Sequence, residues 1–157
     1  MVKKKVKPMQ SPAEKLIGSR DLRSNLSDYM DQVLQKKQVF LVGKKYKPRE
    51  SAALINKELL DLLLAGVEFH SGVNFDASTK QYTAEIDGFN AGGVGDTPGA
   101  AVEMALDNIE DLVEDFFTDF DYYRRFPIYL ERFPQYLKLK LAGSREELAT
   151  LLGLAGR

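Results

Sequence analysis

Hydrophobic residues near the beginning of the chain recur at the spacing of an α-helix. Between residues 19 and 37, four apolar side chains are separated by three or four positions and share one helix face: Leu22, Leu26, Tyr29 and Val33. Ser19 is a residue type that caps the start of such a helix well. The pattern therefore predicts one amphipathic helix with a polar opposite face.

Short apolar runs and a second helical pattern follow this helix. Residues 38–43 and 51–55 are rich in β-forming side chains and flank a basic turn at 44–50, so they predict a hairpin. Residues 56–66 have helical periodicity and begin with Asn56, a favourable N-cap. This part of the chain is expected to form an α-β-β-α module.

The next segment changes to the period of a β-strand. Apolar and polar residues alternate over 67–75 and again over 81–87, and a third short strand is expected through 89–94. A long amphipathic helix then covers about residues 97–120, with apolar side chains on one face and acidic side chains on the other. These elements predict a β-β-β-α module.

The end of the chain is aromatic and contains two prolines. Pro127 and Pro134 divide it into short helices, because proline lacks an amide donor and clashes with the preceding turn. Ser144 and Glu147 have the spacing of a capping box at the start of a final helix. We expect a helical tail here.

Together, the patterns predict an α+β chain with two small modules. A flexible basic arm covers residues 1–12, the α-β-β-α module 13–66, the β-β-β-α module 67–121 and the tail 122–157. No apolar run approaches the roughly 20 residues of a membrane span, so no membrane contact is expected.

Charged residues are separated along the chain, although its formal net charge is −1. Residues 1–66 contain 14 Lys or Arg against 7 Asp or Glu, whereas residues 67–123 contain one Lys against 13 acidic residues. Such blocks suggest two surfaces with opposite electrostatic tasks, and solvated helix faces are the simpler alternative. The chain has no cysteine, which excludes disulfides and is compatible with the reducing cytoplasm.

Seven residues of the first module are candidates for contact with DNA. Three lie near the start of the first helix and four on the basic turn: Arg20, Arg23, Ser24, Lys44, Lys45, Lys47 and Arg49. Arginines and short polar side chains at a helix start can reach phosphates and base edges. A solvated helix and a lysine-rich turn explain the same residues without DNA.

A glycine-rich segment, GGVGDTPG at residues 92–99, precedes the long helix and raises the question of a phosphate site. Pro98 removes an N–H group that a phosphate would need, and Asp96 places a negative charge nearby. The segment also lacks the Gly-Lys-Ser/Thr of a P-loop. Asp-Thr-Pro is instead a good helix start with proline in the first turn, so no nucleotide cofactor is expected.

Carboxylates on the predicted sheet raise the alternative of a metal-dependent nuclease. They lie in turns or on the polar side of a strand, where solvated acids are the simpler interpretation: Asp76, Glu85, Asp87 and Asp96. The one histidine, His70, is not tied by any motif to a nucleophile or a paired acid. We therefore expect no catalytic residue, no metal site and no enzyme activity.

The segment from about residue 11 to 64 resembles the DNA-binding domain of Phd/YefM-type antitoxins. The resemblance is carried by RDLRSNLSDYMDQVLQKKQVFLV, the basic turn with Pro48, and ESAALINKELLDLLL. Four residues match the Arg-x-Asn-Leu-Ser core of that family: Arg23, Asn25, Leu26 and Ser27. The resemblance implies a module that dimerises through its sheet and binds operator DNA.

Residues 67–120 resemble the HicB-type antitoxin domain. The resemblance is carried by YTAEIDGF followed by GDTPGAAVEMALDNIEDLVEDF. It implies a degenerate ribonuclease-H-like fold that acts by binding a toxin. In HicB proteins the DNA-binding part usually follows this domain, whereas the corresponding module precedes it here.

The two resemblances imply a cytoplasmic, non-enzymatic antitoxin of a type II toxin–antitoxin system. Its partners would be operator DNA, a basic protein toxin, and further copies of itself in a homodimer or higher homo-oligomer. Aromatic residues of the tail could contact the toxin: Tyr122, Phe126, Tyr129 and Phe133. The same residues could instead pack on their own chain. A non-enzymatic oligomeric module without DNA binding is the alternative function.

Overall fold

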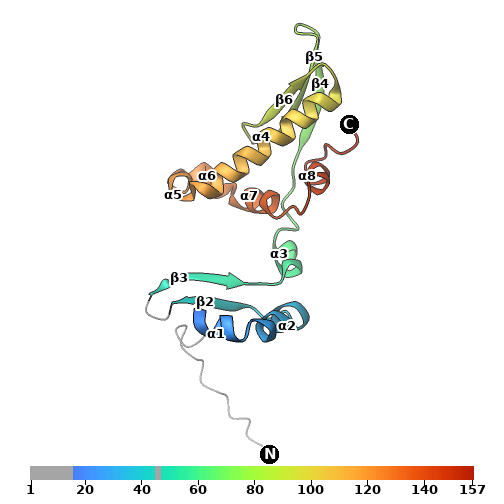
Figure 1. The fold of residues 1–157 in the computed structure, drawn as a ribbon. Helices are drawn as coiled ribbons and strands as arrows, with labels where there is room; N and C mark the ends of the chain where they lie inside the picture. The colour runs from blue at the N-terminus through green and yellow to red at the C-terminus, as the bar shows by residue number, and fades with distance from the viewer. Residues whose placement is uncertain (1–15, 45–46) are drawn as a thin grey trace, which may run out of the picture. The chain divides into compact units, whose positions relative to one another are not determined.

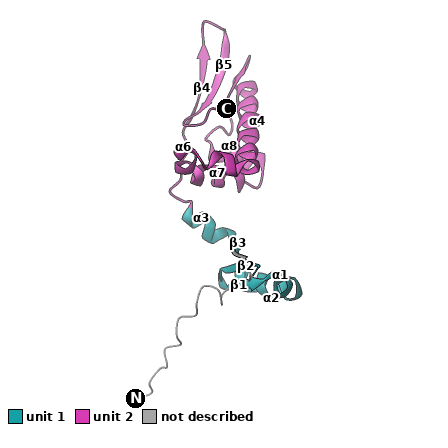
Figure 2. Ribbon diagram, turned by 90° about the vertical axis from the view of Figure 1, so that its left-hand side faces the viewer, with its two compact units in different colours: residues 1–63 teal, residues 64–157 magenta. Residues whose placement is uncertain are grey.

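The chain folds as two compact units, residues 1–63 and residues 64–157, here called unit 1 and unit 2 (Figure 2). The computed structural model describes residues 16–44 and 47–157, so the arm predicted for residues 1–12 lies outside the described residues. Each unit contains a three-stranded sheet within the described ranges. The expected α+β class is confirmed.

Unit 1 combines its sheet with short helices (Figure 1). Its strands are β1 (Leu16–Gly18), β2 (Phe40–Lys44) and β3 (Lys47–Leu54), and its helices are α1 (Ser19–Ser24), α2 (Leu26–Lys36) and α3 (Lys57–Leu63). β1 pairs with β2 in parallel, and β2 pairs with β3 antiparallel. The central strand of this sheet is therefore β2.

The beginning of unit 1 differs from the sequence prediction in three ways, the first being that Gly18, and not Ser19, is the N-cap of α1. β1 was not predicted, because three residues are too few to show a period and the partner strand lies far along the chain. The single predicted helix is broken at Asn25, whose φ of −126° lies outside the helical region. Asn25 Nδ2 donates to Asp21 Oδ1 at 2.8 Å, a local bond of the kind that lets asparagine interrupt a helix.

The basic turn is also shorter than predicted. β3 begins at Lys47, so Lys47 and Arg49 lie in a strand rather than in a turn. The register shifts after the pair Gly43 and Ser51, which leaves residues 48–50 of β3 in a bulge. A proline is tolerated in such a bulge of an edge strand. A Cβ at Gly43 would come within 2.7 Å of the Glu50 carbonyl oxygen, so this crossing of the strands requires glycine.

The hydrophobic core of unit 1 is small. Leu16 and Val33 are its buried hydrophobic residues in the described part of the unit. Tyr29 packs edge-to-face on Phe40, with the ring centroids 5.1 Å apart. Leu41 alternates with Phe40 along β2 and so lies on the other face of the sheet, next to Leu16 of β1, with its own side chain exposed. A unit with so little internal core gains stability from a further contact surface.

Asn56 caps α3, as the sequence predicts. Its Oδ1 accepts a hydrogen bond from the Glu58 amide at 2.8 Å. Its Nδ2 donates to the Leu34 carbonyl at 3.3 Å, and the side chain is only 6% exposed. Asn56 therefore starts α3 and also fixes it to the last turns of α2.

Unit 2 contains an antiparallel sheet, a long helix and a helical tail. The strands are β4 (Ser71–Asp76), β5 (Gln81–Ile86) and β6 (Gly92–Gly95), and the long helix is α4 (Pro98–Thr118). The tail forms α5 (Phe120–Tyr123), α6 (Pro127–Glu131), α7 (Phe133–Lys140) and α8 (Arg145–Leu151). β5 is the central strand, and both of its ladders are antiparallel.

Glycines in β6 allow α4 to lie directly on the sheet. A Cβ at Gly93 would overlap the Ala101 carbonyl oxygen and the Ala105 amide nitrogen, and one at Gly95 would lie 2.6 Å from the Ala101 amide nitrogen. Ala101 and Ala105 are themselves fully buried. The glycine-rich segment therefore serves a contact between two backbones.

The predicted start of α4 is confirmed. Thr97 is the N-cap, and its Oγ1 accepts a hydrogen bond from the Ala100 amide at 3.1 Å. Pro98 occupies the first helical position, where its missing N–H group costs nothing. The segment thus uses its polar atoms to begin a helix.

The aromatic tail packs on α4 of the same unit. Phe116 is fully buried and stacks on Tyr136, with centroids 4.0 Å apart and planes 9° apart. Burial raises the pKa of Tyr136 to about 12. Further rings surround Phe116: Phe117, Phe120, Tyr123, Tyr129 and Phe133. The tail and the sheet therefore share one hydrophobic core.

Three hydrogen bonds connect the tail to the beginning of unit 2. Lys138 Nζ donates to the carbonyl oxygens of Leu64 at 3.1 Å and Val67 at 2.6 Å. Ser71 Oγ donates to the Leu152 carbonyl at 2.5 Å. Residues before and within β4 are thus held by the tail.

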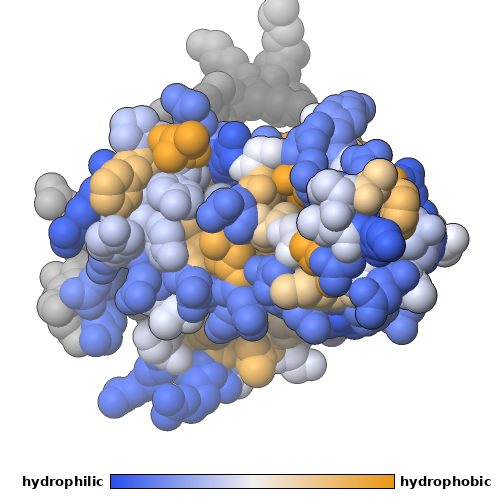
Figure 3. Space-filling view, turned by 90° about the horizontal axis from the view of Figure 1, so that it is seen from above, coloured by the Kyte–Doolittle hydropathy of each residue, from blue (hydrophilic) through white to orange (hydrophobic). Residues whose placement is uncertain are grey.

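The face seen in Figure 3 is mainly hydrophilic, with hydrophobic residues in separate patches. No helix in the described part of the chain is long and apolar enough to cross a membrane.

Candidate functional site

The predicted helical DNA-contact residues lie on α1 and are exposed. Arg20, Arg23 and Ser24 all face solvent. Ser24 Oγ donates to the Arg20 carbonyl at 3.0 Å, so this hydroxyl is engaged within the helix. The two guanidinium groups have no ion-pair partner among the residues that the structure describes.

The acidic residue between these two arginines, Asp21, is engaged in hydrogen bonds with nearby side chains. Asp21 accepts hydrogen bonds from Asn25 Nδ2 at 2.8 Å and from the Tyr29 hydroxyl at 2.7 Å. The bond to Asp21 raises the pKa of Tyr29, so the phenol stays protonated and keeps donating. These bonds occupy Asp21 and leave Arg20 and Arg23 available for an external anion.

The unpredicted strand β1 brings Lys44 to the same end of the sheet as α1. Gly18 pairs with Gly43 in a parallel ladder. The next residue of each strand is Ser19, which starts α1, and Lys44, which is exposed at the end of β2. Parallel pairing therefore places the start of α1 and the basic end of the hairpin together. Lys45 lies outside the described residues.

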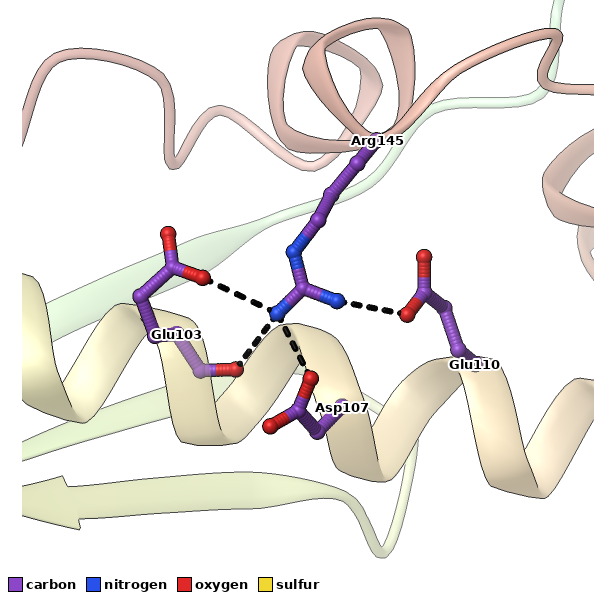
Figure 4. A network of polar contacts seen from close by, with 4 residues as sticks. All are labelled: Glu103, Asp107, Glu110 and Arg145. Atoms are coloured by element: carbon purple, nitrogen blue, oxygen red, sulfur yellow. Dashed lines mark hydrogen bonds and ion pairs between the residues drawn. The ribbon is translucent and has the colours of Figure 1, made fainter.

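Cations of the tail neutralise one side of α4 (Figure 4). The Arg145 guanidinium bonds to Glu103 at 3.0 Å, Asp107 at 2.7 Å and Glu110 at 2.6 Å. These bonds raise the pKa of Arg145, Asp107 contributing most. Sequence reasoning missed this cluster, although the acids are spaced at i, i+4 and i+7, because their partner lies far along the chain. Lys140 neutralises Glu114 in the same way.

A second group of acids on α4 and at its end has no such partner. Asp111, Asp115 and Asp119 are exposed at four-residue spacing and have no ion pair within the described ranges. Burial, followed by the charges of Asp115 and Asp119 among other causes, raises the pKa of Tyr123. We call these three acids the aspartate stripe.

The four predicted partner-contact residues fall into two pairs. Tyr122 and Phe126 are 56% and 41% exposed, with ring centroids 5.3 Å apart. Tyr129 and Phe133 are half-buried and pack against Phe116. Of these four rings, the structure therefore exposes only Tyr122 and Phe126.

The acids considered for a nuclease do not converge. Asp76 lies at the turn end of the β4–β5 hairpin, where Ser78 donates to its Oδ1 through the hydroxyl at 2.6 Å and the amide at 2.8 Å. These bonds lower the pKa of Asp76. Asp87 lies at the other end, where its amide donates to the His70 carbonyl. No cluster of metal-ligating side chains occurs in the described part of the chain.

Comparison with known proteins decides the class. Residues 15–153 match the model of the PHD-like family, described as an antitoxin of toxin–antitoxin, RelE/RelB, TA system. The chain belongs to this antitoxin family. The family indicates a non-enzymatic regulatory protein, and the antitoxin therefore has a partner toxin. One family model spans both units of the antitoxin, whereas the two halves of the sequence resemble two different families.

A solved structure shares the fold of the antitoxin. It is the crystal structure of an antitoxin part of a proposed toxin/antitoxin system from Syntrophomonas wolfei subsp. wolfei. The TM-score is 0.65 at 20% sequence identity, and the match covers 91% of this chain and 96% of that chain. No curated protein matches the antitoxin.

Proposed function

We propose that the antitoxin acts in the cytoplasm, binding operator DNA through unit 1 and a basic protein toxin through unit 2. The observation that carries this proposal is that each unit presents an exposed cluster of like charge with no ion-pair partner among the described residues. Unit 1 presents Arg20 and Arg23, and unit 2 presents the aspartate stripe. The Phd/YefM-like and HicB-like resemblances agree with this division of labour.

DNA binding uses the basic end of unit 1. Arg20 and Arg23 on α1 and Lys44 at the end of β2 are exposed cations at one end of one sheet. Lys45, Lys47 and Arg49 continue the basic hairpin sequence. Such groups bind phosphates and release counterions, and the arginines can also reach base edges.

The exposed part of the unit 1 sheet around Leu41 supports a homodimer. Leu41 is 42% exposed there, and Ala53 lies opposite it on β3. Pairing two such faces buries apolar surface that a small core leaves in water. A dimer also presents two basic ends to a palindromic operator.

Removing single cations tests DNA binding. Arg23→Ala and Lys44→Ala should each weaken binding to the antitoxin's own promoter and lower the salt slope by about 1, because each removes one phosphate contact. Fluorescence anisotropy with a salt titration measures both quantities. Lys36→Ala is the matched control, since Lys36 is exposed at the end of α2, before β2 begins. If affinity and slope are unchanged in both test variants, unit 1 does not bind DNA in this way.

Toxin binding uses the aspartate stripe and the neighbouring exposed rings. Tyr122 and Phe126 follow the stripe directly in the chain, and aromatic side chains are frequent anchors of interfaces. An acidic surface attracts a basic partner over a distance and raises the association rate. The acids bound by Arg145 and Lys140 are less available for this role.

The toxin surface can be tested with isosteric changes. Asp111→Asn, Asp115→Asn and Asp119→Asn together should lower the association rate with the protein encoded by the neighbouring gene about tenfold at low salt. Biolayer interferometry measures this rate. A control chain with Glu68→Gln, Glu85→Gln and Asp87→Asn loses the same charge elsewhere on unit 2. Equal rates for the two variant chains would contradict a specific role for the stripe.

A further inference from the structure

The two edges of the unit 2 sheet differ in how their backbone groups are satisfied. On the outer side of β6, the Gly92 carbonyl accepts a hydrogen bond from Asn108 Nδ2 at 2.6 Å. The Val94 amide donates to Met104 Sδ at 3.4 Å. Side chains of α4 therefore bond to this edge where a further strand would otherwise pair.

The register shows which groups of β4 point away from the sheet. The Asp87 amide donates to the His70 carbonyl at 2.9 Å, so His70 faces β5. Along an antiparallel strand, the amide and carbonyl groups of successive residues point to alternate sides. The ladder from Ser71 to Asp76 has no bulge, so this alternation is unbroken. Gly72 and Asn74 therefore also bond to β5, and the amides and carbonyls of Ser71, Val73 and Phe75 point outward.

The outer edge of β4 is open at Val73 and Phe75. Near Ser71, the Leu152 carbonyl accepts from the serine hydroxyl, so the tail approaches that end. Val73 and Phe75 have no such neighbour in the described part of unit 2, and in Figure 2 β4 lies on the side of the sheet away from α4. The Phe75 side chain is 55% exposed beside this edge and contacts Tyr82.

β4 also lacks the features that keep an edge strand unpaired. Proline, lysine and bulges are common on free edges because they prevent a further strand from adding. The edge strand β3 of unit 1 has all three, whereas the β4 sequence Ser-Gly-Val-Asn-Phe-Asp has none of them. The β4 edge is thus built to accept a strand.

We propose that β4 pairs antiparallel with β4 of a second copy of the antitoxin, about a twofold axis through Asn74. Val73 of each copy then exchanges both backbone hydrogen bonds with Phe75 of the other. The two three-stranded sheets become one six-stranded sheet. This surface is separate from the dimer contact proposed for unit 1 and does not depend on DNA or toxin binding.

The register about Asn74 is favourable for side chains. Phe75 lies next to Val73 of the second copy, an aromatic and β-branched pair that stabilises antiparallel strands. Asp76 lies opposite Gly72 of the second copy, so no like charges oppose each other directly. Ser71 lies opposite Ala77 in the turn, beyond the end of β4.

A cysteine cross-link tests this pairing in the full chain. The chain has no cysteine of its own, and two Asn74 residues would face each other as a non-hydrogen-bonded pair. Their Cα atoms would be about 4.5 Å apart, within the range for a disulfide. Asn74→Cys should therefore form a disulfide dimer with diamide as oxidant. Glu85→Cys, exposed on the central strand of the same sheet, should remain monomeric on a non-reducing gel.

Edge variants in the Asn74→Cys background complete the test. Phe75→Pro removes an outward amide that makes no bond within the sheet, so the fold should persist while cross-linking falls about tenfold. Phe75→Lys keeps that amide and should disfavour pairing through its charge, which provides a second variant if proline unfolds the strand. Equal cross-linking at residues 74 and 85, or cross-linking that both edge variants leave unchanged, would overturn the proposal. An Asn74→Cys chain that cross-links only to an added toxin would also overturn it.

Discussion

Replacing Gly93 with alanine should unfold much of unit 2 at temperatures where the wild-type antitoxin is folded. The new Cβ would overlap the Ala101 carbonyl and the Ala105 amide, which are backbone atoms of α4. Backbone atoms cannot relieve the overlap by changing rotamer as a side chain can. The helix α4 must therefore move away from β6, and the buried residues of α4 lose contacts with the sheet. Overpacking of a core costs about 1–3 kcal/mol and occasionally more, and we expect the upper end here. The melting temperature of unit 2 should fall by at least about 10 °C.

The same substitution at Gly99 is the control. Gly99 lies in the first turn of α4, and a Cβ there would meet nothing within 4 Å. Gly99→Ala should leave stability unchanged or raise it by up to about 1 kcal/mol, because alanine restricts the unfolded chain. Circular dichroism at increasing temperature compares the two variants. A Gly93→Ala chain that melts with the wild type would show that α4 does not press on β6 as described.

Replacing Phe116 with alanine is the second large effect that we expect. Phe116 is fully buried and lies among six other rings, including Tyr136 at 4.0 Å. Its removal leaves a cavity that the surrounding rings cannot close, and such changes cost about 3–5 kcal/mol. Urea unfolding followed by tyrosine fluorescence measures the loss, since the chain has no tryptophan.

Phe126→Ala removes the same side chain from an exposed position. Phe126 is 41% exposed, so we expect its loss to cost less than about 1 kcal/mol. The comparison separates a ring that holds the core from a ring available to a partner. Similar losses for the two variants would mean that the tail packs differently from the arrangement in the structure.

Local sequence patterns correctly predicted the structural features that depend only on neighbouring residues, such as helix caps. The caps at Asn56 and Thr97 are confirmed, and proline occupies the first turns of α6 and α7 as expected. β1 was missed because its pairing with β2 is long-range and only three residues long. The prediction of a single long helix was wrong at Asn25, where the backbone leaves the helical conformation and the side chain bonds to Asp21.

The sequence was sufficient to identify the residues of the candidate site, but not how they are arranged in space. Arg20 and Arg23 were identifiable from the sequence, but their availability depends on Asp21 being held by Tyr29, eight residues away. The sequence pattern of α4 predicts one acidic face. In the structure, Arg145 forms ion pairs with part of these acids and leaves the aspartate stripe unpaired within the described part of the chain. That division depends on α8 packing near α4, which no local pattern reports.

The contacts of Lys138 help to set the length of free chain between the two units. Its ammonium holds the Leu64 and Val67 carbonyls, so the path into unit 2 is fastened before β4 begins. Without Lys138, Phe69 in the core and His70 bonded to Asp87 would still hold the part of this segment next to β4, so the residues nearest α3 would gain the most freedom. The effective concentration of one unit near a ligand held by the other depends on tether length. If the two units bind ligands as proposed, Lys138→Ala should change how strongly one binding event assists the other.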